Sequence, residues 1–349
     1  MQLCNQLSRE ELRQKLEESG QSFITISFYR YLHYENPQEV RDAWYKSLSE
    51  IGVLGRIYIA HEGVNAQIAV PETSYDAFRQ FIDEQPGLDN LRLNIAVEER
   101  GHSFLKLKIK VRPKILADGL NDETFDVTNR GQHLKADDFN RMLDDENTVL
   151  IDMRNHYETE VGHFQSAITP DVDTFRESLP KIEDEILKGN EDKNIVMYCT
   201  GGIRCEKASA WFKHRGFENV YQLEGGIIKY AHDVGENKLE NKFIGKNFVF
   251  DDRREERISE DVIANCHQCG EPFDIHTNCV NDACHILFIQ CEKCAEKYEG
   301  CCSEECQEII HLPEEEQRKL RKGRNNSNRI FKKGKGPQLK YKKKVDQEH

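Results

Sequence analysis

The feature that most constrains the fold is an alternation of β-type and helical segments between residues 148 and 223. Three apolar runs, "TVLID", "NIVMYC" and "NVYQL", are separated by the helical patterns "TFRESLPKIEDEILKG" and "RCEKASAWFKHRG". Strands that alternate with helices pair in parallel and are joined by right-handed crossovers. Ligands of such sheets bind at the carboxyl ends of the strands. Because Cys199 ends the second run, it is predicted to lie in a ligand-binding position.

The segment after this run, Cys199-Thr200-Gly201-Gly202-Ile203-Arg204, leads from the predicted strand into a helix. Adjacent glycines allow successive backbone N–H groups to converge on one point, and a helix N-terminus favours an anion there. A cysteine so placed has its pKa lowered from about 8.5 to roughly 3.5–7.5. Cys199 is therefore the predicted catalytic nucleophile. The rest of the loop is predicted to bind an anion or the substrate: Thr200, Gly201, Gly202, Ile203 and Arg204.

Cys205 follows the loop directly, and two interpretations of it remain open. It could resolve an oxidised sulfur on Cys199 by forming a disulfide, or it could be a small packing residue of the helix.

The N-terminal region, residues 1–115, has the pattern β-α-β-β-α-β. This order is typical of a ferredoxin-like, or acylphosphatase-like, α/β sandwich. A connector rich in Asp, Asn and Gly is expected over residues 116–146, followed by the parallel α/β domain over residues 147–240. The whole chain is accordingly predicted to be an α/β protein.

Nine of the twelve cysteines lie between Cys266 and Cys306, within a predicted Cys-rich module of residues 247–312. In a long chain without an export signal, such crowding favours metal ligation over disulfides. Two Cys-x-x-Cys pairs have a zinc-ribbon spacing, and a closed four-thiolate zinc site is structural. An iron–sulfur cluster is the alternative. The first predicted set is Cys266, Cys269, Cys291 and Cys294, and a tentative second set is Cys279, Cys284, Cys302 and Cys306.

Charge is distributed unevenly along the chain. The formal net charge is −13, yet residues 318–344 hold thirteen Lys and Arg and no acidic residue. The tail, residues 313–349, is predicted to be disordered and to contact RNA, although a solubilising tail would have the same composition. No apolar stretch approaches the roughly 20 residues that span a bilayer, and no leader peptide is recognised. A cytoplasmic protein that does not contact membranes is expected, and the oligomeric state stays open.

The loop matches the Cys-x-x-Gly-x-Arg pattern of rhodanese domains through Cys199, Gly202 and Arg204. Two further rhodanese signals are present, as Asp152-Met-Arg154 and as Leu223-Glu-Gly-Gly226. The middle of the chain therefore resembles a rhodanese domain. Its loop has six positions rather than the seven of related phosphatases, which favours sulfur chemistry over phosphate hydrolysis. Asp152 and Arg154 are expected to tie the fold together rather than to act as acid or base.

Over residues 20–330 the chain resembles the bacterial oxygen-dependent tRNA uridine hydroxylases. The resemblance is carried by "RIYIAHEGVNAQIAVP", "VMYCTGGIRCEKASAW", "GKNFVFDDRREERIS" and "CHQCGEP" with "HTNC". It implies hydroxylation of the wobble uridine to 5-hydroxyuridine, with molecular oxygen as co-substrate, Cys199 as the essential residue and the tRNA anticodon loop as partner. The sequence contains no G-x-G-x-x-G fingerprint, so the oxygen-activating cofactor stays unknown.

Two other functions remain open. One is a rhodanese-type sulfurtransferase that carries a persulfide on Cys199, with tRNA as one candidate acceptor of the sulfur. The other is a noncatalytic RNA-binding module whose loop only holds an anion.

Two N-terminal motifs have both a structural and an RNA-binding interpretation. "FYRYLHY", residues 28–34, offers aromatic rings and charge for base stacking, but alternate strand residues face opposite sides and half must pack in the core. "HEGVNAQ" places His61, Glu62 and Asn65 at a predicted hairpin turn, where they serve either turn formation or RNA contact.

Overall fold

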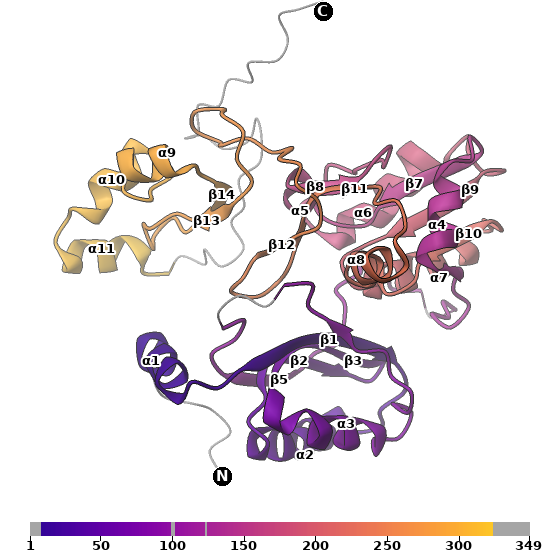
Figure 1. The fold of residues 1–349 in the computed structure, drawn as a ribbon, viewed down its shortest axis with the longest axis horizontal. Helices are drawn as coiled ribbons and strands as arrows, with labels where there is room; N and C mark the ends of the chain where they lie inside the picture. Colours follow the sequence, from indigo (N-terminus) through magenta and orange to yellow (C-terminus); the bar gives the residue numbers. More distant parts are fainter. Residues whose placement is uncertain (1–7, 99–101, 123, 324–349) are drawn as a thin grey trace, which may run out of the picture. The chain divides into compact units, whose positions relative to one another are not determined.

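The computed structural model describes residues 8–98, 102–122 and 124–323 (Figure 1). The chain forms two compact units. The first comprises residues 1–154, 166–242 and 249–256, and the second comprises residues 155–165, 243–248 and 257–349. Within the described ranges, none of the helices has the length and apolar character needed to cross a bilayer.

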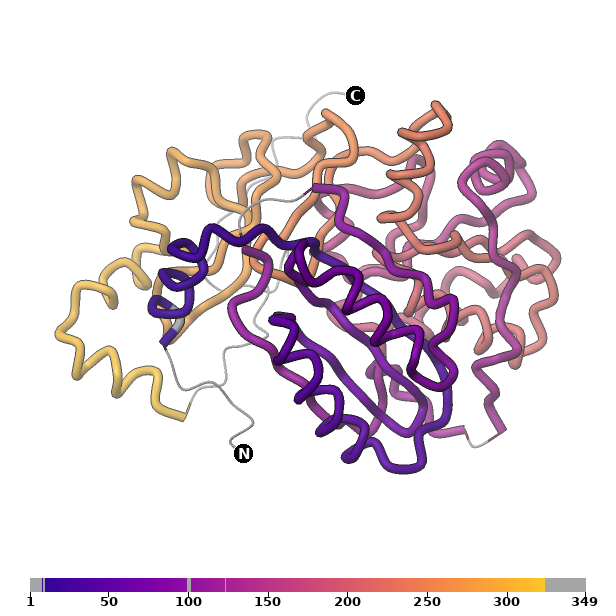
Figure 2. The backbone as a smooth tube through the Cα atoms, turned by 60° about the horizontal axis from the view of Figure 1, so that its bottom comes forward, coloured from indigo at the N-terminus to yellow at the C-terminus, as the bar shows by residue number. Residues whose placement is uncertain are grey.

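The first unit contains the expected N-terminal sandwich, whose sheet has the strand order β4-β1-β3-β2-β5. Neighbouring strands run antiparallel except β2 and β5, which are parallel. Its helices α2 and α3 cover one face of the sheet (Figures 1 and 2). The elements are α1 (Arg9–Ser19), β1 (Phe23–Tyr31), α2 (Pro37–Glu50), β2 (Leu54–Ala60), β3 (Gly63–Pro71), the 3₁₀ turn η1 (Glu72–Ser74), α3 (Tyr75–Asp83), β4 (Asn94–Ile95) and β5 (Leu107–Val111).

Strand β1 explains how this sheet presents two different faces. Its residues Ile26 and Phe28 are buried in a core with Trp44 of α2 and Phe78 of α3. Since side chains alternate along a strand, the intervening residues, Tyr29 among them, point to the other face. That second face of the sheet is the one available for contacts with the rest of the first unit.

The rhodanese-like part of the first unit is a parallel sheet with the order β6-β10-β9-β7. The segment predicted as a connector supplies β6 and α4, so this sheet takes in chain that precedes residue 147. The elements are β6 (Gln132–Leu134), α4 (Ala136–Leu143), β7 (Thr148–Asp152), α6 (Phe175–Ile182), the π-helical turn η2 (Glu183–Leu187), β9 (Asn194–Tyr198), α7 (Ile203–His214), β10 (Val220–Leu223) and α8 (Gly226–Asn237).

The second unit contains short elements around the cysteines, and β8 pairs with β11 antiparallel, as β13 does with β14. Its elements are α5 (His156–Glu160), β8 (Gly162–Phe164), β11 (Phe243–Phe248), β13 (His276–Asn278), β14 (Leu287–Ile289), α9 (Glu292–Lys297), α10 (Glu304–Ile310) and α11 (Glu314–Arg321). The short strand β12 (Glu255–Arg257) lies where the chain passes from the first unit to the second.

Helix α11 corrects part of the expectation for the tail, because residues 314–321 were predicted to lack structure. Acidic residues fill its first turn and basic residues its last, an arrangement that favours the helix dipole. An ion pair one turn apart joins Glu314 and Arg318. The remaining tail, residues 324–349, lies outside the described residues.

Candidate functional site

The loop of residues 199–204 leaves the carboxyl end of β9, which lies between β7 and β10 in the parallel sheet. This is the position that the sequence predicted. The Cys199 side chain is fully buried, whereas Thr200, Gly201 and Ile203 are partly exposed. The sulfur itself is thus covered, and the loop is open to solvent at its outer residues.

Gly202 gives the loop its shape. Its φ of 103° lies in the region that favours glycine, and it caps the N-terminus of α7. In this conformation the Gly202 N–H points back and donates to the Cys199 Sγ over 3.1 Å. The Arg204 guanidinium donates to the Thr200 hydroxyl at 3.3 Å, which places a positive charge on the loop. The loop thus holds the sulfur among N–H donors at a helix N-terminus.

A second helix fixes the loop from the opposite side. The N–H groups of Ile227 and Ile228, at the start of α8, donate to the carbonyl oxygens of Cys199 and Thr200 at 3.0 and 3.2 Å. This close approach requires Gly226, because a Cβ there would lie 2.5 Å from the Cys199 carbonyl oxygen. The Gly-Gly signal recognised in the sequence therefore has a steric cause.

The environment of Cys199 favours its thiolate. Burial, the largest single influence, would raise its pKa, but a hydrogen bond from the Cys205 thiol, the charge of Arg204 and backbone N–H donors together lower the pKa to about 6. The pKa of Cys205 is raised well above its usual value by burial and by the neighbouring sulfur. Of the two thiols, Cys199 is thus the one that ionises first, and the Cys205 thiol donates the hydrogen bond to it.

This donor role leads to a pH prediction. In the parent protein, the rate of Cys199 alkylation by iodoacetamide should rise as pH increases through about 6 and then level off, because the thiolate is the reactive form. Cys205→Ala removes a hydrogen bond to an ionised group, so the midpoint should move up and the rate at pH 6 should fall roughly fivefold. Mass spectrometry of the Cys199 peptide measures the rate. An unchanged midpoint would show that Cys205 does not stabilise the thiolate.

Asp152 and Arg154 form an ion pair with no exposed surface, in which Arg154 Nη2 lies 2.7 Å from Asp152 Oδ2. The Arg154 guanidinium also stacks over the ring of Tyr198, at the end of β9. The pair therefore joins β7 to the strand that carries Cys199. This geometry agrees with the structural role expected from the sequence.

The N-terminal sandwich contacts helix α7 through a buried lysine that the sequence did not single out. Lys207 is 2% exposed and its Nζ lies 2.6 Å from Glu62 Oε2 and 2.7 Å from Asp118 Oδ2. Burial alone would raise the pKa of Asp118, but hydrogen bonds from Lys114 and Lys207 lower it, so Asp118 is a carboxylate. Lys207 also lies 5.2 Å from the centre of the Tyr31 ring. This cluster fixes the sandwich against the helix that begins at the loop.

The "HEGVNAQ" hairpin accordingly has structural contacts. Glu62 accepts from the Ile115 N–H as well as from Lys207. Asn65 donates to the Ile115 carbonyl, and the His61 ring bonds the Tyr34 carbonyl. These hydrogen bonds give the residues of the motif a structural role, in shaping the turn and in packing the sandwich against α7.

Removal of Lys207 is expected to destabilise the first unit. Lys207→Ala leaves the fully buried Asp118 with one partner fewer, which should cost about 3 kcal/mol of unfolding free energy. Lys114→Ala is the matched control, since it removes the half-exposed partner of the same carboxylate and should cost about 0.5 kcal/mol. Urea denaturation measures both values. Equal losses of unfolding free energy in the two variants would show that the burial of Lys207 does not strengthen its contact with Asp118.

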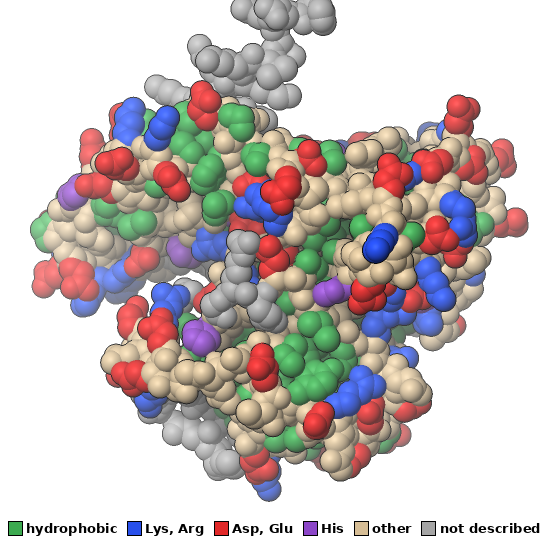
Figure 3. Space-filling view, in the orientation of Figure 1, with side chains coloured by type: hydrophobic (Ala, Val, Ile, Leu, Met, Phe, Trp, Pro, Cys, Tyr) green, Lys and Arg blue, Asp and Glu red, His purple; other side chains and the backbone are tan. Residues whose placement is uncertain are grey.

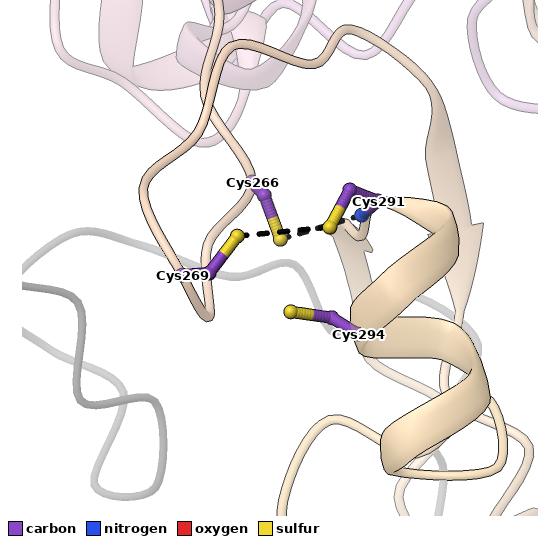
Figure 4. A group of neighbouring side chains, drawn as sticks. All are labelled: Cys266, Cys269, Cys291 and Cys294. Carbon is purple, nitrogen blue, oxygen red and sulfur yellow. Dashed lines mark hydrogen bonds between the residues drawn. The ribbon is translucent and has the colours of Figure 1, made fainter.

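In the second unit, the first predicted cysteine set comes together (Figure 4). The four Sγ atoms lie within 4.8 Å of one another and point to a common centre, with Cys291 and Cys294 at the start of α9. Cys269 Sγ lies 3.6 Å from Cys291 Sγ. Four sulfurs around a zinc ion with Zn–S bonds of about 2.3 Å would be about 3.8 Å apart. The set fits a tetrahedral metal ion without rearrangement.

The tentative second set also comes together, with the Sγ atoms of Cys279, Cys284, Cys302 and Cys306 within 4.8 Å of one another. Cys302 Sγ lies 3.7 Å from both Cys284 Sγ and Cys306 Sγ. Cys301 is buried beside this set but belongs to neither. His267, which adjoins the ligand Cys266, contacts Glu160 and accepts from the Ile289 N–H. Both sets therefore consist of cysteine sulfurs alone.

Comparison with family models divides the chain into three matched domains. A UPF0176 acylphosphatase like domain matches residues 23–115, a rhodanese-like domain residues 135–233 and a rhodanase C-terminal domain residues 244–307. The fold and the Cys199 loop define the chain as a rhodanese-domain protein with an acylphosphatase-like N-terminal sandwich and C-terminal cysteine clusters.

Relatives that match nearly the whole chain identify a narrower family within the rhodanese-domain proteins. The chain is 57% identical to the tRNA uridine(34) hydroxylase of Enterobacter sp. strain 638, over 96% of both chains. It is 58% identical to that of Salmonella gallinarum, over 96% of this chain and 95% of the relative, and 55% identical to that of Leptospira interrogans, over 95% and 90%. The chain therefore belongs to the tRNA uridine(34) hydroxylase family, as the sequence motifs indicated.

Proposed function

We propose that the protein hydroxylates the uridine at position 34 of tRNA to 5-hydroxyuridine, with molecular oxygen as co-substrate. The observation that carries the proposal is the identity of 55–58% with tRNA uridine(34) hydroxylases over nearly the whole chain. The loop adds chemical support, because it provides a sulfur nucleophile with a pKa of about 6 at the end of a parallel strand.

Within this function, Cys199 is the proposed catalytic residue. The loop backbone from Thr200 to Ile203 and the charge of Arg204 would hold negative charge that develops on the sulfur or on the base. Two reaction types fit a thiolate in this setting. Cys199 could add to C6 of uracil and make C5 nucleophilic, or it could carry an oxidised sulfur such as a persulfide or sulfenate.

Mass spectrometry of the protein trapped during turnover separates these two reactions. A uridine-sized adduct on Cys199 supports addition to the base. Addition of only oxygen or sulfur to Cys199 in a fully active protein rejects base addition and supports the oxidised-sulfur reaction.

The proposed partner is the tRNA anticodon loop. On the face shown in Figure 3, basic and acidic side chains are intermixed rather than gathered into one basic surface. The thirteen Lys and Arg of residues 318–344, most of which lie outside the described residues, would neutralise phosphates. Proteins read unstacked RNA loops by stacking and edge hydrogen bonds, so a cationic segment that binds phosphates and a separate site that binds the base are complementary.

We also propose that each cysteine set holds structural zinc. Four thiolates gathered within 4.8 Å of one another would form a closed site, which contributes folding energy and leaves no open coordination position. Two backbone N–H groups donate to ligand sulfurs, from Cys291 to Cys266 and from Cys302 to Cys279. Such bonds stabilise thiolates and favour a fixed site.

The function is tested with purified protein and tRNA from cells that lack the gene. Incubation in air should yield 5-hydroxyuridine at position 34, and incubation under nitrogen should yield none. Nucleoside mass spectrometry identifies the product. Formation of thiolated uridine in place of 5-hydroxyuridine would support the sulfurtransferase alternative, and tRNA binding without any new nucleoside would support a noncatalytic module.

A further inference from the structure

The N-terminal sandwich contributes directly to the surroundings of the sulfur loop. Asn94, on β4, donates its side-chain N–H to the Gly201 carbonyl oxygen over 3.2 Å. A Cβ on Gly201 would lie 3.8 Å from the Ser27 hydroxyl, and one on Gly202 would lie 2.9 Å from the Tyr29 hydroxyl. Strands β1 and β4 are neighbours in the sheet, so their second face meets the loop. The outer surface of the loop is thus shared between the two domains.

Tyr29 is a residue of this face whose functional group is available for a ligand. It lies between Phe28 and Arg30 on β1 with its side chain on the face opposite the core, and it is partly exposed. Among the described residues, its hydroxyl forms no hydrogen bond. Its ring packs edge-on against Tyr31 at 6.2 Å, which fixes the direction of the hydroxyl.

The Tyr29 hydroxyl is protonated at neutral pH. Burial raises its pKa well above the usual value, and the negative charges of Glu206 and Cys199 raise it further. A neutral phenol donates a hydrogen bond, and uracil presents two carbonyl oxygens as acceptors. The phenol lies directly against the loop, because Gly202 has no side chain and a Cβ there would come within 2.9 Å of the Tyr29 hydroxyl.

We propose that Tyr29 is a substrate-binding residue whose hydroxyl donates a hydrogen bond to a carbonyl oxygen of the target uracil and holds the ring over the Cys199 loop. The inference rests on the proposed function, because it takes uracil as the ligand. It assigns to the acylphosphatase-like domain a part in base recognition. A site that hydrogen-bonds one group of its substrate also discriminates against analogues that lack that group.

The test is Tyr29→Phe, which removes the hydroxyl and keeps the ring. We expect kcat/KM for 5-hydroxyuridine formation to fall roughly tenfold or more, the loss that corresponds to one substrate hydrogen bond. The melting temperature and the pH profile of Cys199 alkylation should match those of the parent, since the loop itself keeps its contacts. The matched control is Tyr31→Phe on the same strand, whose buried hydroxyl has no hydrogen-bond partner among the described residues and whose removal should leave kcat/KM within about twofold.

Parental activity in Tyr29→Phe would overturn the proposal, as would an equal loss in Tyr31→Phe. A loss accompanied by a changed alkylation profile or melting temperature would assign Tyr29 to packing of the loop and would also overturn it. If the parent protein itself formed no 5-hydroxyuridine, the proposed function would fail instead, so the two failures are distinguishable.

Discussion

Replacement of Cys199 by serine is expected to lower the rate of 5-hydroxyuridine formation by at least about 10³-fold. A serine hydroxyl in the same loop stays protonated at neutral pH, whereas the Cys199 thiol has a pKa of about 6 and is mostly ionised. The rate is measured by nucleoside mass spectrometry of tRNA sampled during single-turnover incubation. Serine is nearly isosteric with cysteine, so the melting temperature should stay close to that of the parent.

The control for Cys199→Ser is Cys205→Ala, which removes the neighbouring thiol but retains the nucleophile. Above pH 7 the activity of Cys205→Ala should stay within about tenfold of the parent, because Cys199 still ionises there. Equal loss in both variants would point to a disulfide or relay between the two sulfurs. Full activity in Cys199→Ser would remove the sulfur from the reaction altogether.

Loss of one cysteine ligand from the second set is expected to have the largest effect on stability. Cys284→Ser should lower the zinc content by one equivalent per chain and reduce the unfolding free energy of the second unit by on the order of 5 kcal/mol, because metal binding and folding are coupled. Metal analysis by plasma mass spectrometry and thermal unfolding provide the two readouts. Iron and sulfide in the purified protein, with no zinc, would contradict the zinc assignment.

Cys301→Ser is the control for this experiment. Cys301 is as buried as the ligands and adjoins Cys302, yet it belongs to neither set. The zinc content of this variant should equal that of the parent, and the loss of stability should be limited to the cost of a buried hydroxyl, about 1–2 kcal/mol. Loss of metal from Cys301→Ser would mean that the ligand sets are wrong.

Local patterns were sufficient to predict the elements that carry the site. The β-branched and aromatic residues of β1 are typical of a strand, and one face of this strand lies in the core. The apolar run and glycines around Cys199 predicted the turn from β9 into α7. The spacing of two Cys-x-x-Cys pairs also predicted the first cysteine set, whereas the spacing of the remaining cysteines does not fix which of them form the second set.

Contacts between distant residues could not be predicted in this way. Glu62 and Lys207 are 145 residues apart, and nothing in the sequence of α7 distinguishes Lys207 from a solvent-exposed lysine. Tyr29 meets the loop only because the second face of the N-terminal sheet packs there, and a strand pattern does not say what covers each face. Helix α11 was missed because its charged composition is also typical of disordered tails.

The most direct test is the identity of the nucleoside at position 34 of tRNA. The tRNA is taken from cells that lack the chromosomal gene and carry a copy of it on a plasmid. The gene for the parent protein should restore 5-hydroxyuridine and its derivatives at position 34. The Cys199→Ser gene, expressed to the same level, should leave uridine there. Restoration by Cys199→Ser would contradict the claim that this sulfur carries the reaction.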